Sequence, residues 1–284
     1  MKNNKKPYIL LFLVVGVISL FTVSYIKKNG NHFNGFSDQN LGARDKSFEQ
    51  QIKFSVDKKE TLEMISNARK ILSYEVKSIG KYDYQDYYFD SPNYDIAKLG
   101  YSYRFRVADK GNDKIEYRVQ LKKEYEAENK ESFVRTEIDI AIPEDLAKDL
   151  LAGNFKRIFS DNLNNEKIKE LNSFLVSQKI DMNSLLPIIY GRQFRDRHRF
   201  KENKITFFEI SLDEAYFKDL RDENKEIRFM EMEFENKYTG GYRGEQTGFI
   251  DERINKLVNF FSEKYKIKIT KDSKYKKVVN AFKM

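Results

Sequence analysis

Tyr101-Ser102-Tyr103-Arg104-Phe105-Arg106-Val107 sets two arginines at alternate positions of a run that is otherwise mostly apolar. A β-strand turns successive side chains to opposite faces, so Arg104 and Arg106 share one face of a strand here. The other face carries two tyrosines, a phenylalanine and a valine, and it has to be buried. The run therefore predicts a strand that stands between an apolar core and a charged space.

Five further segments alternate charged or amide side chains with mostly apolar ones. They are Glu49-Gln50-Gln51-Ile52-Lys53, Arg118-Val119-Gln120-Leu121-Lys122, Arg135-Thr136-Glu137, Glu209-Ile210-Ser211-Leu212-Asp213 and Glu231-Met232-Glu233-Phe234-Glu235. For any single strand, the plain alternative is a sheet with one solvated face, but solvated faces usually mix in Thr, Ser and Asn. Six such strands together favour a closed barrel whose lumen carries both signs of charge. Such a lumen could hold a polyanion and its divalent cation.

The composition limits the chemistry that the chain can carry out. Its 284 residues carry a formal charge of +8, and there is no cysteine. Disulfides and thiolate metal sites are therefore excluded, and His32 and His198 cannot form a histidine zinc site on their own. Any metal is then a hard cation held by carboxylates. The positive charge suits nucleic acid, an anionic membrane surface or a phosphorylated small molecule, and net charge alone does not choose among them.

The N-terminal segment is expected to anchor the chain in a membrane. Pro7 to Ile26 contains no charged residue, and its length matches a hydrocarbon core of about 30 Å. We therefore expect an anchor at residues 1–28 that spans the membrane with residues 7–26, followed by a flexible tether at 29–47. Nearly balanced flanking lysines lean only slightly toward an extracytoplasmic domain. A cleaved signal peptide is the alternative, although no small-x-small site ends the segment.

Residues 48–284 read as one domain in which strands come in runs with few helices between them. Gly111-Asn112-Asp113 is a turn signal between two strands. Helices are expected at 58–73, at 155–185 and after Thr247-Gly248. This order argues against a parallel sheet with crossover helices. The predicted fold is α+β: an eight-stranded antiparallel closed β-barrel, or tunnel, with peripheral helices, preceded by one transmembrane helix.

The segment Tyr88-Phe89-Asp90-Ser91-Pro92, with the arginine strand that follows it, resembles the CYTH family, the triphosphate tunnel metalloenzymes. Other family motifs follow in matching order over about residues 48–278: Glu49, Gln51 and Lys53 for Glu-x-Glu-x-Lys, Leu121-Lys122, Arg135 with Glu137, the basic strand Arg192 to Arg199, Glu209 with Asp213, Glu231 with Glu233, and Ser273-Lys274. The resemblance implies a tunnel for substrates that bear a triphosphate or a longer phosphate chain. It also extends to the related polyphosphate polymerase domain of the vacuolar transporter chaperone.

The charged positions fall into two predicted sets. A triphosphate carries about four negative charges and needs comparable positive charge when buried. The phosphate-binding set is Lys53, Arg104, Arg106, Lys122, Arg135, Arg197 and Lys274. The acidic set makes sense if Mg²⁺ or Mn²⁺ bridges carboxylates and phosphate oxygens. Its metal ligands are Glu49, Glu209, Asp213, Glu231 and Glu233, and the predicted catalytic residues are Glu49, Lys53 and Glu231.

Neighbours of these positions are assigned plainer roles. Arg195 and Arg199 share a face with Arg197 and are predicted at the rim of the tunnel, whereas His198 points the other way and is expected to be packed or on the surface. Gln51 departs from the family, because a glutamate that helps to hold the metal stands there in other members. An amide oxygen can still coordinate Mg²⁺, but without a charge.

The leading hypothesis is a metal-dependent hydrolase of triphosphate or polyphosphate, with Mg²⁺ or Mn²⁺ as its cofactor. Gln51 motivates one alternative, a binding module without turnover. The membrane span and Ser273-Lys274-Tyr275 motivate another, a membrane-bound polyphosphate synthase. A basic module for nucleic acid or membrane surfaces is disfavoured by the alternation within strands, so no specific nucleic-acid partner is expected. The sequence does not indicate the oligomeric state.

Overall fold

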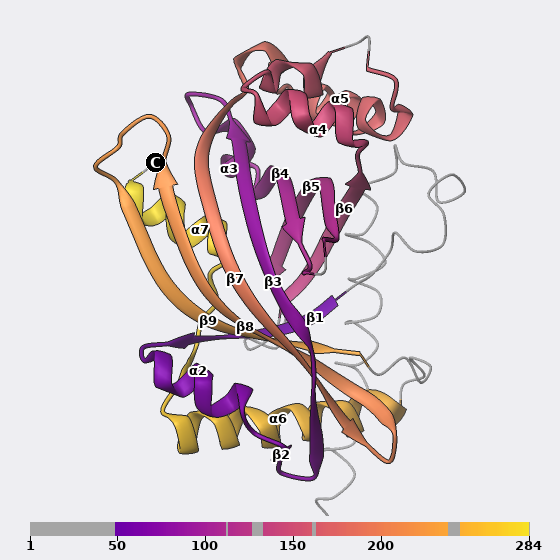
Figure 1. The fold of residues 1–284 in the computed structure, drawn as a ribbon, viewed down its shortest axis with the longest axis vertical. Coiled ribbons are helices and arrows are strands. Elements are labelled where there is room, and N and C mark those ends of the chain that lie inside the picture. The colour runs from indigo at the N-terminus through magenta and orange to yellow at the C-terminus, as the bar shows by residue number, and fades with distance from the viewer. Residues whose placement is uncertain (1–48, 112, 127–132, 161–162, 238–244, 284) are drawn as a thin grey trace, which may run out of the picture. The chain divides into compact units, whose positions relative to one another are not determined.

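The computed structural model describes residues 49–111, 113–126, 133–160, 163–237 and 245–283 (Figure 1). They belong to one compact unit, Asp45–Met284. The anchor and tether expected at 1–28 and 29–47 lie outside the described residues. Within the described part of the chain, no helix combines the length and apolar character needed to cross a membrane. The membrane anchor therefore stays a prediction.

The described strands form one antiparallel sheet. They are β1 Glu49–Val56, β2 Lys70–Ile71, β3 Tyr74–Asp90, β4 Tyr101–Asp109, β5 Ile115–Glu126, β6 Phe133–Ala141, β7 Leu186–Glu202, β8 Ile205–Asp219, β9 Glu226–Asn236 and β10 Lys268–Ile269. The α-helices are α2 Lys59–Ser66, α3 Asp95–Lys98, α4 Glu144–Leu151, α5 Glu166–Ser177, α6 Glu245–Tyr265 and α7 Lys274–Phe282, with 3₁₀ turns η2 Phe155–Phe159 and η3 Met182–Ser184. The predicted antiparallel sheet with peripheral helices is confirmed.

The strand order of the sheet is β10-β1-β6-β5-β4-β3-β7-β8-β9, with β2 paired to β3 and a further pairing between β1 and β9. The antiparallel class is confirmed, whereas the predicted closure into a barrel is not. The start of β1, Glu49 to Gln51, pairs with β6, and Gln51 to Val56 pairs with β9. The sheet has ten strands rather than the expected eight. The two additions are the two-residue strands β2 and β10, which are too short to show a periodic pattern in the sequence.

The helix expected at 58–73 ends early. Helix α2 stops at Ser66, and Lys70–Ile71 pairs instead with the start of β3. Leu72 takes a positive φ of 52°, which helices do not contain, and its side chain is exposed. Tertiary pairing thus overrides the apolar spacing that extends through Leu72.

The segment expected to be helical at 155–185 is divided into η2, α5 and η3, and it covers the outer face of the arginine strand. Tyr103 and Phe105 on that face are completely buried. The ring of Phe159 packs against Tyr103 with centroids 5.8 Å apart, and Phe159 also meets Phe89 of β3. The predicted stripe within α5, at Ile168, Leu171 and Leu175, is buried as expected. The insertion therefore serves to bury the apolar side of β3 and β4.

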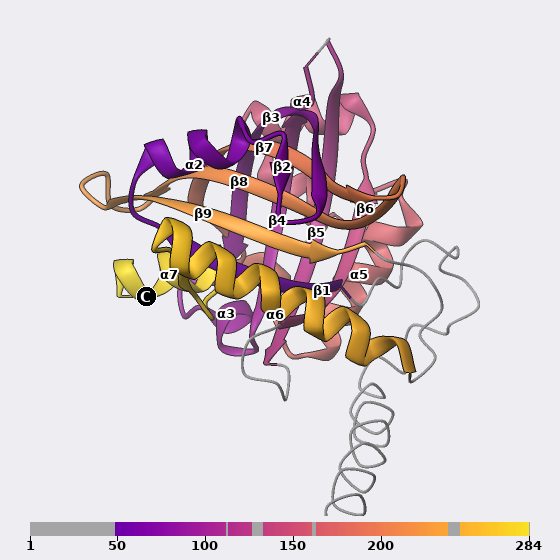
Figure 2. The same ribbon diagram turned by 90° about the horizontal axis from the view of Figure 1, so that it is seen from below.

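A second apolar cluster lies at the other end of the sheet. Helices α2 and α6 cover the sheet at the bottom of Figure 1, and Figure 2 shows both helices from below, whereas α4 and α5 lie at the top. Ile65 of α2 and Phe261 of α6 are completely buried against Phe54, Phe208 and Phe234 of the strands. With its outer face covered at both ends, the sheet can keep its charged positions for the inner face.

Gly191 of β7 tests how closely two strands pack. A methyl group at this position would lie 2.6 Å from a ring carbon of Phe217, its register partner on β8. Phe217 is buried, so the ring has little room to move. We expect Gly191→Ala to lower the free energy of unfolding by about 1–3 kcal/mol, measured by urea denaturation.

Phe217→Leu supplies the control for this prediction. In the Gly191→Ala background, it should recover part of the lost stability, because the smaller side chain relieves the overlap. Strictly additive losses in the double variant would contradict the packing argument.

Candidate functional site

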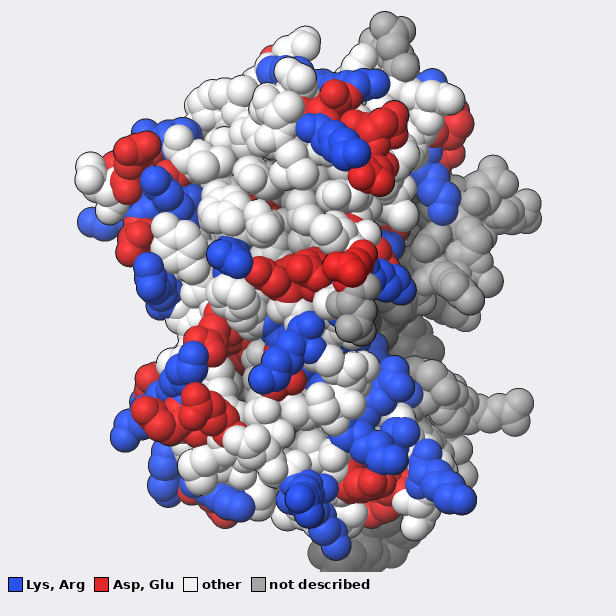
Figure 3. All heavy atoms as spheres, in the orientation of Figure 1, with Lys and Arg blue, Asp and Glu red and all other residues white. Residues whose placement is uncertain are grey.

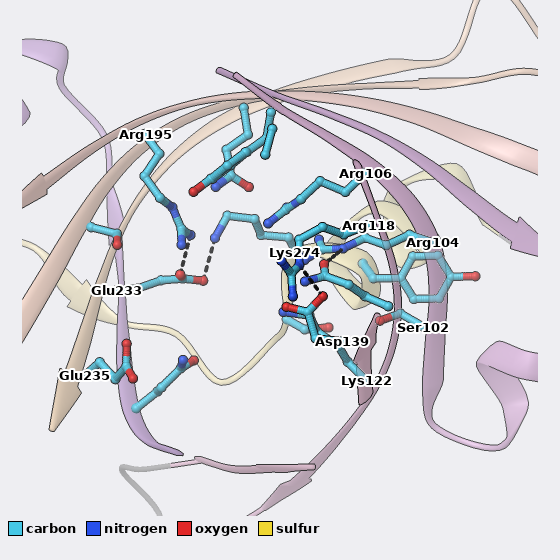
Figure 4. Close-up of a pocket in the computed structure, with 18 of the residues that line it drawn as sticks. Ser102, Arg104, Arg106, Arg118, Lys122, Asp139, Arg195, Glu233, Glu235 and Lys274 are labelled. Carbon is cyan, nitrogen blue, oxygen red and sulfur yellow. Dashed lines mark hydrogen bonds and ion pairs between the residues drawn. The ribbon is translucent and has the colours of Figure 1, made fainter. Parts of the chain in front are cut away.

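The inward face of the sheet lines a cavity of about 300 Å³. Basic side chains outnumber acidic ones in its lining, which includes Arg104, Arg106, Lys110, Arg118, Lys122, Arg195, Arg197, Lys237, Lys274, Glu116, Asp139, Glu209, Glu233 and Glu235. In Figure 4, Arg104, Arg106, Arg118 and Lys122 stand on one side and Glu233 and Glu235 on the other. The alternation in the strands thus brings Arg104, Arg106, Lys122 and Arg197 into one cavity, and helix α7 adds a fifth predicted phosphate-binding residue, Lys274.

Asp86 of β3 holds the two arginines of β4 in place. Its carboxylate accepts hydrogen bonds from Arg106 Nε at 2.6 Å and Nη2 at 2.7 Å, and from Arg104 Nη1 at 3.1 Å. Arg104 also donates to Gln120 Oε1 at 2.7 Å and to the Tyr88 hydroxyl at 2.9 Å. The bidentate bond of Arg106 and the three bonds of Arg104 fix both guanidinium groups, which is the form of preorganisation that phosphate recognition uses.

The charge of Asp86 is set by its surroundings. Burial by itself raises the pKa of this carboxyl, but the charges of Arg104 and Arg106 outweigh burial and lower the pKa to about 2. Asp86 is therefore ionised at neutral pH and offsets part of the positive charge on this wall.

Three carboxylates on β8 and β9 converge on one lysine. Lys274 Nζ lies 3.0 Å from Asp213, 2.9 Å from Glu231 and 2.6 Å from Glu233. Burial by itself lowers the pKa of Lys274, but the three negative charges raise it well above its ordinary value. Lys274 was predicted to bind phosphate. It does line the cavity, but its described partners are the acidic residues that were predicted to hold the metal.

Arg195 does not lie at the rim, where it was expected. Its guanidinium donates to both oxygens of Asp213, at 2.7 and 2.6 Å, and also pairs with Glu233. Burial by itself lowers the pKa of Arg195, but the charges of Asp213 and Glu233 raise it well above the ordinary value. Arg195, Arg197 and Arg199 share one face of β7, and the sequence of a strand does not show how deep in the cavity each position lies.

Arg197, Arg199 and His198 of β7 lie where the sequence predicts them. Arg197 lines the cavity and donates from Nε to Glu209 at 2.8 Å, and Arg199 is half exposed beside the same carboxylate. Glu209 is thus committed to Arg197 rather than to the Glu231 and Glu233 pair. His198 faces away from the lumen and is buried, with Nε2 3.1 Å from Asp196, as predicted for a packed histidine.

The remaining predicted residues belong to β1 and β6. Lys53 is buried at 1% exposure and lies opposite Glu233 in the register of β1 and β9. The backbone of Glu49 pairs with that of Arg135, but both side chains lie outside the described residues. Their proposed roles stay predictions.

The acidic row, which consists of Asp213, Glu231 and Glu233, does not fit a metal ion as it is arranged. Among the side chains that the structure describes, no group of three or more Asp, Glu, His or Cys residues is placed to hold one. The three carboxylates lie 2.6 to 3.0 Å from the Lys274 ammonium, which are hydrogen-bond distances. Magnesium–oxygen bonds are about 2.0–2.1 Å long.

The motif Tyr88-Phe89-Asp90-Ser91-Pro92, at the end of β3, positions the helix that carries Lys274. Asp90 accepts hydrogen bonds from the backbone of Ser91, Ile96 and Ala97 at 2.8 to 3.0 Å, and from the Tyr275 hydroxyl at 3.1 Å. The Tyr275 ring stacks on Tyr88 with centroids 5.1 Å apart. The motif therefore ties the start of α7 to β3, and so places Lys274 over the acidic row.

Several residues at the site were not singled out from the sequence as site residues. Those that line the cavity are Tyr88, Arg118, Gln120, Asp139 and Gln193. Asp86 pairs with Arg104 and Arg106, and Lys277 pairs with Glu231. Arg118 and Gln120 share the alternating face of the predicted strand that ends at Lys122, so their positions were readable. Asp86 lies in a run of alternating acidic and aromatic residues without a family motif, so only the pairing of β3 with β4 reveals its role.

The outer surface contrasts with this cavity. On the face shown in Figure 3, Lys and Arg are interspersed with Asp and Glu, so this view of the described residues contains no continuous basic band. The alternation within the strands has instead concentrated Arg104, Arg106, Arg118 and Lys122 inside.

Comparison with known proteins agrees with this architecture. The CYTH domain family profile matches residues 48–239. The chain therefore belongs to the CYTH domain family, as its motifs indicated.

Two solved structures are among those similar to this chain. An adenylyl cyclase candidate from Hippeastrum, described as having a dominant triphosphatase activity, has 16% identity and a TM-score of 0.55, over 80% of this chain and 93% of its own. A protein from Pyrococcus horikoshii has 17% identity and a TM-score of 0.48, over 82% of this chain and 99% of its own. Among curated proteins, none matches this chain.

The low pKa of Asp86 predicts an acid-sensitive contribution to stability. Since the folded pKa of about 2 lies below the ordinary 3.8, the contribution is complete above pH 3.8 and is lost as the pH falls through 2. The shift corresponds to about 2 kcal/mol. Asp86→Asn should therefore unfold more easily than the wild type at neutral pH, with a gap that narrows between about pH 5 and 2. Urea denaturation across this range measures the gap, and parallel pH curves would contradict the assignment.

Proposed function

We propose that the chain binds a triphosphate or polyphosphate inside an enclosed tunnel of this sheet and hydrolyses a phosphoanhydride bond. The observation that carries the proposal is the cavity itself, with Arg104, Arg106, Arg118 and Lys122 on one wall and carboxylates on the other. The pairing of β1 with both β6 and β9 supports enclosure. Membership of the CYTH family and the triphosphatase activity described for the Hippeastrum protein support the reaction class.

The described residues divide the work between binding and chemistry. Arg104 and Arg106, held by Asp86, would form bidentate bonds to phosphate oxygens, and Lys122 would add a point charge. Stabilising the charge of a transferred phosphoryl group is the main task in such reactions. Glu233 lines the opposite side of the cavity, and in this proposal its carboxylate would orient the attacking water.

The divalent cation predicted from the sequence remains part of this proposal. Mg²⁺ or Mn²⁺ would neutralise phosphate charge and polarise phosphate oxygens when bound. The acidic row as arranged holds Lys274 instead, so the roles assigned to Arg104, Arg106 and Glu233 do not depend on a metal.

A phosphate-release assay tests the proposal. Tripolyphosphate and nucleoside triphosphates, each with Mg²⁺ or Mn²⁺, should release phosphate, and Arg106→Ala should raise KM about 10- to 100-fold because a charged hydrogen-bond donor is lost. Arg192→Ala is the matched control, because Arg192 is an exposed arginine paired with Asp83 on the outer face. If the two substitutions change KM equally, the cavity is not where the substrate binds.

A binding module without turnover is the second candidate, and Gln51 favours it. Gln51 lines the cavity where family members carry a glutamate, so the site has one carboxylate fewer for a metal. On this alternative, tripolyphosphate binds with the same affinity in EDTA as in Mg²⁺, and no phosphate is released.

Isothermal titration in EDTA and in Mg²⁺ decides between the two candidates. For the hydrolase, Gln51→Glu should strengthen the dependence of tripolyphosphate affinity on Mg²⁺, since the added carboxylate is a metal ligand. Ser102→Glu, which also adds a carboxylate to the cavity lining but on the basic wall, should weaken binding in both conditions. If neither variant nor wild type responds to Mg²⁺ and none turns over substrate, the binding module is the correct assignment.

A further inference from the structure

Gln193 of β7 carries a buried amide donor that faces the cavity. Its side chain is only 2% exposed, and it belongs to the cavity lining. Among the described residues, its Nε2 atom has no hydrogen-bond partner. A buried donor without a partner lowers the stability of a folded protein, so such groups are rare and call for an explanation.

The described positions around Gln193 on the inner face show why its amide finds no acceptor among them. Tyr84 of β3 and Ala215 of β8 are its register partners. Gly191 and Arg195 stand two residues away on β7, on the same face. Gly191 and Ala215 have no polar side-chain atom, and the guanidinium of Arg195 can only donate.

The surroundings of Gln193 are nevertheless suited to an anion. Arg106 from the basic wall and Arg195 beside the acidic row both approach the ring of Tyr84. Their Cζ atoms lie 4.2 and 5.7 Å from its centroid. Because Tyr84 is the register partner of Gln193, a phosphate oxygen bound at Gln193 would have two guanidinium groups close by.

The amide differs from these guanidinium groups because internal carboxylates already hold them. Arg106 donates to Asp86 through two of its nitrogen atoms. Arg195 donates in the same way to Asp213. A phosphate chain has to compete with those carboxylates for the arginines, whereas it meets the amide of Gln193 without such competition.

We propose that Gln193 is a substrate-binding residue, and that its Nε2 donates a hydrogen bond to an anionic oxygen of the bound phosphate chain. The inference rests on the proposed function, which supplies the phosphate chain. The partner that the amide lacks then arrives with the substrate. This role accounts for a polar side chain at a buried position where an apolar one would leave no donor unpaired.

Binding of tripolyphosphate in EDTA tests this assignment, because no divalent metal is then available for turnover. Gln193→Met nearly keeps the length and volume of the side chain and removes the donor. Calorimetry on the full chain should show that Kd rises about tenfold or more, since a hydrogen bond to a charged group is lost. Without ligand, the melting temperature of this variant should equal or exceed that of the wild type, because a buried unpaired donor is gone.

Gln85→Met is the matched control. Gln85 lies on the outer face of β3, where its Oε1 accepts a hydrogen bond from the Tyr190 hydroxyl at 3.4 Å. The substitution removes the same amide from outside the cavity, so the affinity for tripolyphosphate should equal that of the wild type. An unchanged Kd in Gln193→Met, or an equal rise in Gln85→Met, would overturn the proposal.

The melting temperature distinguishes binding from a purely structural role. A structural role predicts the reverse result for Gln193→Met, namely a lower melting temperature without ligand and an unchanged Kd, and that result would overturn the proposal. If Gln193→Met fails to fold, Gln193→Asn decides. It keeps an amide but shortens the side chain by one methylene group, so Kd should again rise, and an unchanged Kd would reject the role of Gln193.

Binding and phosphate release are measured separately, so the two proposals fail separately. Weaker binding by Gln193→Met, with no phosphate release from the wild type in Mg²⁺ or Mn²⁺, overturns the hydrolase alone. Phosphate release from the wild type, with equal Kd values for the wild type and Gln193→Met, overturns the role of Gln193 alone.

Discussion

Buried charge has to meet opposite charge, and this constraint shapes the interior of the protein. The sheet directs Asp86, Arg104, Arg195, Asp213 and other ionic groups into a space with little water. An isolated ion there would cost several kcal/mol. Each of these four is accordingly found in an ion pair with a neighbouring strand. The charged groups inside are therefore already paired. On the proposed function, a phosphate chain would displace some of these partners.

The two walls of the cavity differ in how their charges are paired. On the basic wall, Asp86 fixes the arginines and leaves the side with excess positive charge. On the acidic wall, Arg195 and Lys274 form ion pairs with the carboxylates. On the function proposed above, a phosphate chain would therefore bind against the first wall.

The motif that suggested the family also links distant parts of the fold. Asp90 caps the short helix α3 and receives the Tyr275 hydroxyl, so it links β3 to the C-terminal helix. Residues separated by 185 positions along the chain are thereby joined at one point. Tyr88 adds a stacked ring on one side and a hydroxyl that accepts from Arg104 on the other. The position of the cavity residues Tyr88 and Lys274 thus depends on the hydrogen bond between Tyr275 and Asp90.

Alternation along single strands determined which residues face inward. Arg104, Arg106, Lys122, Arg197 and Glu233 were all readable in this way, because a strand has a period of two in any context. The antiparallel class followed from the order of strands and turns. The two short strands did not, because two residues are too few to show a period. Strand β2 pairs across a tight turn with the start of β3, whereas β10 pairs with β1, which is distant in the sequence.

Only the tertiary structure decided which inward residues meet. Arg195 rather than Arg197 reaches Asp213, and Lys274 pairs with the predicted metal ligands, because the register of neighbouring strands and the docking of α7 set those distances. The physical reason is that periodicity is a local property of the backbone. Partner choice depends on contacts between segments far apart in the chain, which no single segment encodes.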